Sequence, residues 1–137
     1  MLLCELDEIY ENRALIYYKK KDFLRAVDDF TQAIAHTSPQ KKIYFYEMIY
    51  NTSALYSQRG WCYHCMGNYD KAIEDYTQAL SINRDNYFAL SKRCYAYRAI
   101  GEEEKANIDF KNNETRYGTA KNWGLVTMGL DDPFKAW

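Results

Sequence analysis

The sequence predicts an all-α fold, a superhelix of three helical hairpins with a short C-terminal capping segment. The segments FLRAV, YDKAI and EEKAN superpose on their alanines, which reveals an internal repeat. Ala72 and Ala106 are 34 residues apart, whereas Ala26 and Ala72 are 46 apart, the same period plus 12. Such a period is one helix–turn–helix unit of a stacked array. With 47% hydrophobic and 17% aromatic residues, the 137-residue chain can bury a core.

The first hairpin is predicted at about residues 7–40. Its turn carries Lys21, where the other two hairpins carry Gly67 and Gly101. A non-glycine residue in the left-handed conformation costs about 1–2 kcal/mol, so we expect either strain at Lys21 or a slightly different turn. The residues that repeat at helical spacing are Tyr10, Ala14, Tyr17, Phe23, Ala26, Val27, Phe30, Ala33 and Ile34.

The 12 additional residues predict one lengthened helix over about residues 40–66. Pro39 suits the first turn of a helix, and no other Pro or Gly occurs between it and Gln58. The protruding end of this helix needs cover from residues 1–9 or from a second protein. We therefore predict a second interface, made of Tyr44, Phe45, Tyr46, Met48, Ile49 and Tyr50.

The second hairpin, at about residues 53–86, is the most regular. Small groups at positions 60, 72 and 79 let two antiparallel helices approach, and tyrosines fill the space between them. Gly67 is expected to end the first helix in a left-handed conformation, and Asn68 and Asp70 to cap the second. The framework residues are Tyr56, Gly60, Tyr63, Gly67, Tyr69, Ala72, Ile73, Tyr76, Ala79 and Leu80.

The third hairpin, at about residues 87–120, is predicted to end the array. Polar Glu103, Asn107 and Asn113 replace an aromatic, an aliphatic and a small residue, as in a terminal repeat whose outer face meets water. We expect one domain over residues 1–129 and an irregular tail over 130–137. The hairpin keeps Leu90, Cys94, Tyr97, Gly101, Ala106 and Phe110, and a cap is expected from Trp123, Leu125, Val126 and Met128.

These repeated residues resemble the tetratricopeptide repeat over about residues 7–120. The resemblance implies a concave groove, lined by the first helix of each hairpin, that binds an extended or helical peptide. Trp61 and Tyr95 are expected as apolar anchors, because large aromatics often become binding hot spots; alternatively, Trp61 packs between neighbouring first helices. Lys92 and Arg98 are expected to pair with acidic groups. The predicted groove residues are Tyr18, Gln58, Trp61, His64, Phe88, Lys92, Tyr95 and Arg98.

One subfamily invites a direct comparison, because YSQRGWCY and LSKRCYAY look like segments of cytosolic co-chaperones. Those proteins clamp the C-terminal carboxylate of a chaperone peptide with Lys, Asn and Arg side chains. The corresponding positions here are Glu11, Leu15, Gln58, Phe88 and Lys92, which keep little beyond Lys92. A Glu repels a carboxylate in a partly desolvated groove, so the sequence predicts a different specificity.

No motif indicates catalysis, a cofactor or a metal, and we expect a non-catalytic protein. Cys62, His64 and Cys65 fall within four residues, but His64 would point about 100° or more away from either cysteine on a helix. No further cysteine or histidine pair supplies the ligands that a structural zinc site needs. The glycines form no phosphate loop, and neither His36 nor His64 belongs to a nucleophile motif.

Arginine recurs in phase at Arg13, Arg59 and Arg93. Two interpretations stay open. Each side chain could bridge successive helices with its stem buried and its head in water, or the three could form a basic ladder for an anionic ligand.

Composition narrows the class of partner. The 18 Lys and Arg against 19 Asp and Glu leave a net charge of −1, which disfavours non-specific nucleic-acid binding. The segment MLLCELDEIYENR lacks the features of a signal peptide, and no run of 18 apolar residues occurs. We therefore expect a cytoplasmic chain without membrane insertion, whose four cysteines are reduced.

The predicted function is that of an adaptor, which docks a peptide or helix of another protein in its groove. His64 and Gln58 would then hydrogen-bond the peptide backbone. The alternative is a structural subunit of a larger assembly, or a homo-oligomer, that uses the helix at about residues 40–66. In a variant of either, residues 131–137 occupy a groove, because Phe134 and Trp137 are unusual residues to leave in solvent.

Overall fold

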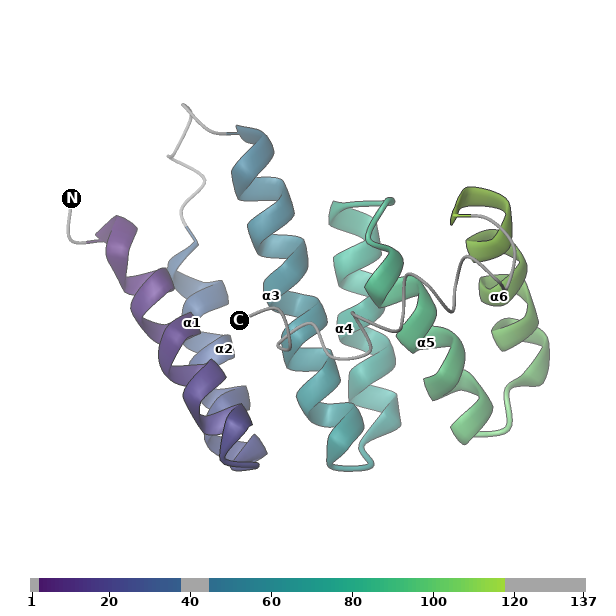
Figure 1. Ribbon diagram of the computed structural model, residues 1–137, viewed down its shortest axis with the longest axis horizontal. Helices are drawn as coiled ribbons and strands as arrows, with labels where there is room; N and C mark the ends of the chain where they lie inside the picture. The colour runs from purple at the N-terminus through teal and green to yellow at the C-terminus, as the bar shows by residue number, and fades with distance from the viewer. Residues whose placement is uncertain (1–2, 38–44, 118–137) are drawn as a thin grey trace.

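The computed structural model describes residues 3–37 and 45–117, and every regular element in these ranges is a helix. The helices pair into three hairpins, which confirms the all-α prediction (Figure 1). The elements are α1 (Leu3–Lys19), α2 (Phe23–His36), α3 (Phe45–Cys65), α4 (Tyr69–Ile82), α5 (Tyr87–Ala99) and α6 (Glu103–Tyr117).

The hairpins stack side by side into two layers. The first helices α1, α3 and α5 lie on the near side of Figure 1, with α2 and α4 behind them. Each helix packs on its neighbours in the chain, and α3 also contacts α5. Small residues hold the seams, since Ala14, Ala26, Ala33, Ala72 and Ala79 have no exposed surface. Side chains this small let helix axes approach closely. The predicted seam positions therefore lie where two helices pack together, as expected from their size.

The three hairpin turns share one backbone geometry. Lys21 has φ 60°, against 77° for Gly67 and 82° for Gly101. In each turn the next residue donates a backbone hydrogen bond across the helix end, as Asp22 does to the carbonyl of Tyr17 at 2.9 Å. Of the two expectations for Lys21, strain in a left-handed conformation is therefore the correct one.

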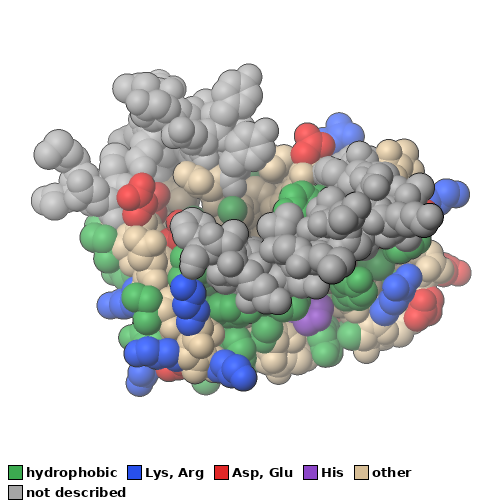
Figure 2. Space-filling model, viewed as in Figure 1, with side chains coloured by type: hydrophobic (Ala, Val, Ile, Leu, Met, Phe, Trp, Pro, Cys, Tyr) green, Lys and Arg blue, Asp and Glu red, His purple; other side chains and the backbone are tan. Residues whose placement is uncertain are grey.

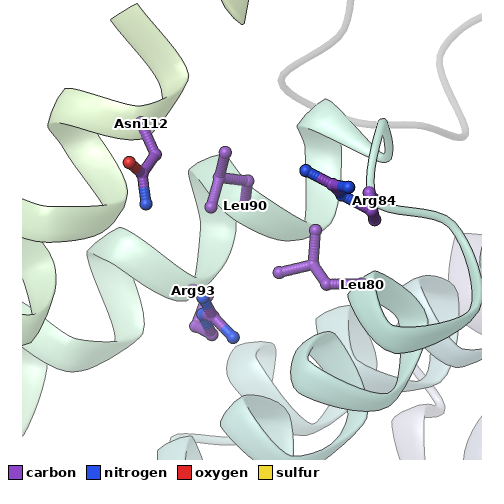
Figure 3. Close-up of a pocket in the computed structure, with 5 residues that line it drawn as sticks. All are labelled: Leu80, Arg84, Leu90, Arg93 and Asn112. Carbon is purple, nitrogen blue, oxygen red and sulfur yellow. The ribbon is translucent and has the colours of Figure 1, made fainter. Parts of the chain in front are cut away.

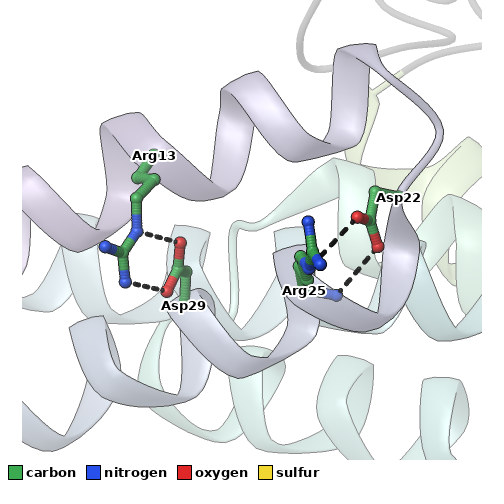
Figure 4. Close-up of polar contacts among 4 residues, drawn as sticks. All are labelled: Arg13, Asp22, Arg25 and Asp29. Atoms are coloured by element: carbon green, nitrogen blue, oxygen red, sulfur yellow. Dashed lines mark hydrogen bonds and ion pairs between the residues drawn. The ribbon is translucent and has the colours of Figure 1, made fainter.

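Side-chain caps begin the second helices. Asn68 is the N-cap of α4 and accepts a hydrogen bond from the Lys71 backbone at 3.4 Å. Asp70 lies inside the first turn, where its carboxylate faces the positive end of the helix dipole. Asp22 caps α2 in the same way and also lies 3.5 Å from Arg25 (Figure 4).

The predicted long helix corresponds to α3, which spans 21 residues. Its expected first residues, 40–44, lie outside the described residues, so Tyr44 does too. Phe45, Tyr46, Met48, Ile49 and Tyr50 belong to the first turns of α3, but their side chains are not among those described. The expected capping residues after position 117 and the tail at 130–137 also lie outside the described ranges.

The in-phase arginines bridge helices. Arg13 forms two hydrogen bonds to the Asp29 carboxylate, at 2.7 and 2.8 Å, and so joins α1 to α2 (Figure 4). Arg59 makes the same pair with Asp75, and Arg93 with Asp109. These side chains therefore bridge helices as expected, but their heads pair with buried carboxylates of the chain itself, and those of Arg59 and Arg93 do not lie in water as the interpretation had them.

Two of these arginines also connect one hairpin to the hairpin before it. Arg59 donates to the Thr31 hydroxyl and Arg93 to the Thr77 hydroxyl, each at 3.2 Å. The three aspartates share the repeat, since each follows its aligned alanine by three residues. That spacing was the signal for these partners, and the sequence analysis missed it.

Candidate functional site

The predicted groove residues come from all three first helices. Tyr18 lies near the end of α1, Trp61 and His64 lie in the last turns of α3, and α5 supplies the rest apart from Gln58. Contacts between rings and polar groups bring most of them together. The members in mutual contact, here called the Trp61 cluster, are Tyr18, Trp61, His64, Phe88, Lys92 and Tyr95.

Trp61 is the centre of this cluster. Its indole N–H donates a hydrogen bond to the Tyr18 hydroxyl at 2.9 Å, which ties α3 to α1. Its ring centroid lies 6.0 Å from that of Phe88 in an edge-on arrangement, which ties α3 to α5. Trp61 thus packs between neighbouring first helices, and it keeps part of its surface exposed. Both expectations for this residue describe part of its environment.

Lys92 places its ammonium group among aromatic rings. The nitrogen lies 4.6 Å from the ring centroid of Trp61, 5.6 Å from that of Tyr95 and 5.7 Å from that of Phe88. Only 8% of Lys92 is exposed. Aromatic faces carry partial negative charge and stabilise such a cation, so the positive charge is held at a fixed place in the Trp61 cluster.

His64 packs against Trp61, at 5.1 Å between ring centroids, within reach of the Lys92 charge. Burial, and next the Lys92 charge, lower the pKa of His64 from its ordinary value to about 4. The ring is therefore neutral at pH 7, with Nδ1 3.4 Å from the Tyr76 hydroxyl. The rings of Tyr69 and Tyr76 pack at its edge, at 5.1 and 6.3 Å between centroids. These supporting tyrosines come from α4, and sequence analysis had placed them only in the framework.

This lowered pKa predicts an acid-sensitive fold. Since the unfolded chain protonates His64 near its ordinary pKa and the folded chain does not until about pH 4, stability falls as the pH drops through this window. We expect the free energy of unfolding to fall by about 1 kcal/mol between pH 7 and pH 5 through this group, after discounting for solvent screening. Urea titrations at both pH values measure it. In His64→Gln the contribution should vanish, and an equal loss in that variant would refute the assignment.

Gln58 presents an unused acceptor. It is 5% exposed, and its Oε1 atom has no hydrogen-bond partner within the described part of the chain. Its side chain also hydrogen-bonds Glu11, and burial followed by the nearby Asp7 charge raises the pKa of that carboxyl. A buried acceptor without a donor is costly, and because Oε1 is itself buried, a partner N–H reaches it only after the side chain moves.

The remaining predicted residues differ in accessibility. Phe88 is 8% exposed and belongs to the core, whereas Tyr95 is 46% exposed. Arg98 is exposed, and its guanidinium lies 5.7 Å from the ring centroid of Phe110 on α6. Figure 2 shows hydrophobic side chains spread over this face of the molecule, with Lys and Arg towards its edges. The accessible part of the site therefore consists of the Tyr95 ring, part of Trp61 and the Arg98 guanidinium.

Comparison with known families decides the identity of the repeat. The model of the tetratricopeptide repeat matches residues 53–86, and a second model of the same repeat matches residues 7–35. This chain is a tetratricopeptide-repeat protein. No curated sequence matches it significantly.

Solved structures of tetratricopeptide-repeat proteins share the fold. The first tetratricopeptide domain of Spaghetti (RPAP3), bound to the HSP90 peptide SRMEEVD, is 18% identical with a TM-score of 0.70 over 90% of each chain. A crystal structure of MamA is 26% identical, with a TM-score of 0.66 over 78% of this chain and 56% of MamA. A second MamA structure is 25% identical, with a TM-score of 0.66 over 83% and 59% of the two chains. The chain therefore spans somewhat more than half of MamA.

The repeats offer no metal centre among the described residues, where no three His, Cys, Asp or Glu side chains gather to hold an ion. Within the described ranges, Cys62 and Cys94 are buried, Cys65 is exposed, and none of the three forms a disulfide. None of the described helices combines the length and apolar character that crossing a bilayer requires.

One hollow lies outside the groove, where α4, α5 and α6 meet. Its volume is about 150 Å³, and Figure 3 shows the side chains around it: Leu80, Arg84, Leu90, Arg93 and Asn112. On α5, Leu90 lies on the side opposite to Lys92, and Arg93 lies about 100° around the helix from it, as helical spacing requires. Typical small-molecule sites measure roughly 300–1,000 Å³, and Arg93 is already paired with Asp109. The hollow is therefore not the candidate site.

Proposed function

We propose that this chain is a non-catalytic adaptor, which binds a peptide or helix of a partner protein in the groove formed by α1, α3 and α5. The observation that carries the proposal is the Trp61 cluster, in which a buried cation, a partly exposed indole and the exposed Tyr95 lie together. The RPAP3 domain, which has the same fold, is described with a peptide bound. The cytoplasm is the compartment that we expect for this activity.

Each group has a role in the proposed complex. Trp61 and Tyr95 offer aromatic surface, which often supplies most of the binding energy at interfaces. Lys92 and Arg98 favour acidic side chains of the partner, and the Gln58 acceptor, which has no donor within the described residues, takes a backbone N–H once its side chain turns outward. Neutral His64 positions Trp61 through a ring contact at 5.1 Å.

The proposed specificity differs from that of a carboxylate clamp. Glu11 and Leu15 occupy positions where the resembled co-chaperones hold a C-terminal carboxylate with Lys and Asn. Leu15 is 7% exposed, and the raised pKa of Glu11 reflects burial and the Asp7 charge. Neither side chain attracts a carboxylate, so we propose a partner segment that binds through internal acidic and aromatic contacts.

A pull-down from native lysate tests the proposal. The intact chain is compared with Tyr95→Ala combined with Arg98→Glu, because both residues are exposed and can change without loss of the fold. Ile108→Ala is the matched control, since Ile108 is 59% exposed on α6, away from the groove. We expect a partner that the groove variant loses and the control keeps.

Direct binding measurements complete the test. A peptide of the identified partner should bind with a micromolar dissociation constant, about −8 kcal/mol, and at least tenfold more weakly to the groove variant. SRMEEVD should bind no better than millimolar, about −4 kcal/mol. Equal capture by all variants would remove the groove proposal, and tight SRMEEVD binding would overturn the specificity alone.

The second predicted interface stays a prediction. It rests on residues 44–50, whose side chains lie outside those described.

A further inference from the structure

The outer face of α1 corresponds to a surface that is buried in the other two hairpins. In α3, Leu55 and Cys62 are 2% and 0% exposed and pack in one cluster with Val27 and Phe30 of α2. In α5, Ala89 and Ala96 have no exposed surface and pack in one cluster with Tyr76 of α4. Both α3 and α5 are thus covered by the second helix of the preceding hairpin.

The repeat assigns Ile9 and Ile16 of α1 to these same two positions. Ile9 is 56% exposed and Ile16 is 53% exposed. They are seven residues apart, so they share one face of the helix. Single exposed aliphatic residues are common, but here both members of a repeated interface pair are aliphatic and uncovered.

Arg13 lies between these isoleucines, and it too is more exposed than its counterparts in the other two hairpins. Its side chain is 55% exposed, whereas those of Arg59 and Arg93 are 18% and 19% exposed. Arg59 and Arg93 each donate a third hydrogen bond to a Thr on the preceding second helix. Arg13 keeps the pair with Asp29, and α1 is the first helix of the described residues. Along α1 the face thus carries an aliphatic side chain, then a hydrogen-bond donor, then a second aliphatic side chain.

The helices that cover α3 and α5 define what fits such a face. α2 presents Val27, Thr31 and Ile34, and α4 presents Ile73, Thr77 and Leu80 at the same positions of the repeat. The outer aliphatics pack in the two core clusters, and the central Thr accepts from the arginine. The complementary stripe is therefore aliphatic, Thr and aliphatic at positions i, i+4 and i+7 of a helix.

The last helix of the described residues, α6, does not carry this stripe. At the corresponding positions, α6 has Asn107, Lys111 and Glu114. Docked on α1 of a second copy, Lys111 would face Arg13, and two polar side chains would cover the isoleucines. Like charges and unpaired polar groups disfavour such a contact, so head-to-tail stacking of identical chains is blocked.

We propose that the face of Ile9, Arg13 and Ile16, here called the α1 face, docks a helix of a partner protein that presents an aliphatic–Thr–aliphatic stripe. This interface continues the stacking seen between α2 and α3 and between α4 and α5. It is separate from the groove, so one chain can hold two partners at once. The α1 face therefore makes the adaptor bivalent.

Helical peptides from the chain itself test the proposal. The probe spans residues 68–83, the α4 sequence, and a hydrocarbon link between positions 71 and 75 keeps it helical on the side opposite the stripe. The control peptide carries the α6 stripe through Ile73→Asn, Thr77→Lys and Leu80→Glu. Fluorescence anisotropy measures binding to the full chain. We expect the probe to bind at least tenfold more tightly than the control peptide.

Variants of the full chain locate the binding. Ile9→Gln combined with Ile16→Gln changes two exposed side chains and should weaken the probe at least tenfold, with the thermal midpoint unchanged. Tyr95→Ala in the groove should leave probe affinity unchanged. Equal binding of both peptides, or equal binding to the isoleucine variant, would overturn the proposal.

Sedimentation of the chain at micromolar concentration tests the other candidate occupant of the α1 face, which is a second copy of the chain. We expect a monomer. A dimer that the isoleucine variant dissociates would assign the α1 face to a second copy and overturn the partner helix. Groove variants that lose their partner while the probe still binds would leave this inference standing without the proposed groove function.

Discussion

Replacement of Asp75 by Ala is expected to lower the free energy of unfolding by about 3 kcal/mol, because breaking a buried ion pair from one side strands the other charge. The Asp75 carboxylate accepts hydrogen bonds of 2.7 and 2.8 Å from Arg59, and 7% of its side chain is exposed. Arg59 donates three side-chain hydrogen bonds, two of them to Asp75 and one to Thr31. In the variant its side chain, which is 18% exposed, keeps the one to Thr31. That partial exposure places the loss at the low end of the usual range for buried pairs.

Removal of both charges provides the matched control. Burial raises the pKa of the Asp75 carboxyl, although the hydrogen bonds and charge of Arg59 act to lower it. The cost of burying this charge is therefore large. Arg59→Met combined with Asp75→Leu should therefore recover most of the stability that Asp75→Ala loses. Urea titrations followed by circular dichroism measure both variants, and a double variant as unstable as the single one would contradict this explanation.

The first hairpin supplies an internal comparison. Asp29→Ala breaks the same pair with Arg13, but Arg13 is 55% exposed and its charge can return to water. Asp29→Ala should therefore lower the free energy of unfolding clearly less than Asp75→Ala does. Equal losses would show that stacking between hairpins does not set the strength of the pair.

The fold was predictable because its rules are local and periodic. The repeat of alanines, glycines and tyrosines predicted helices, turns and small-residue seams that the structure contains. The Asp partners of the arginines follow the same period, but an acidic residue in a second helix looks like solvent-facing charge until the two helices are placed together. Asn86 was missed for a similar reason: its amide donates to Ser53 and Ser57 at 2.9 and 2.7 Å, across two hairpins.

The environment of the groove was less predictable. Sequence position assigned Phe88 and Lys92 to the groove, yet both are 8% exposed, and Lys92 lies among three aromatic rings. These contacts depend on how closely α3 approaches α5, and that approach is set by the stacking of complete hairpins rather than by any local pattern. The bond from Trp61 to Tyr18 spans 43 residues and depends on the same geometry.

The second large effect is expected at Gly60, where Val should lower the free energy of unfolding by about 3 kcal/mol, the upper end of the usual cost of overpacking. A Cβ atom added at Gly60 would lie 2.9 Å from Cε1 and 3.0 Å from Cδ1 of Tyr76, and 3.1 Å from Cβ of Asp75. Tyr76 has no exposed surface, so its ring has no free space to move into. The two further methyl groups of Val enlarge the clash.

The sign of the smaller change tests this cause. In an ordinary helix interior, Gly→Ala stabilises by about 0.5–1 kcal/mol. At Gly60 we expect Ala to destabilise instead, by less than Val, as measured by thermal and urea unfolding. If the Tyr76 ring is the obstacle, Tyr76→Leu should reduce the penalty of Gly60→Ala, which appears as a coupling energy in a double-mutant cycle. Additive effects would show that the Tyr76 ring is not the obstacle to a Cβ atom at Gly60.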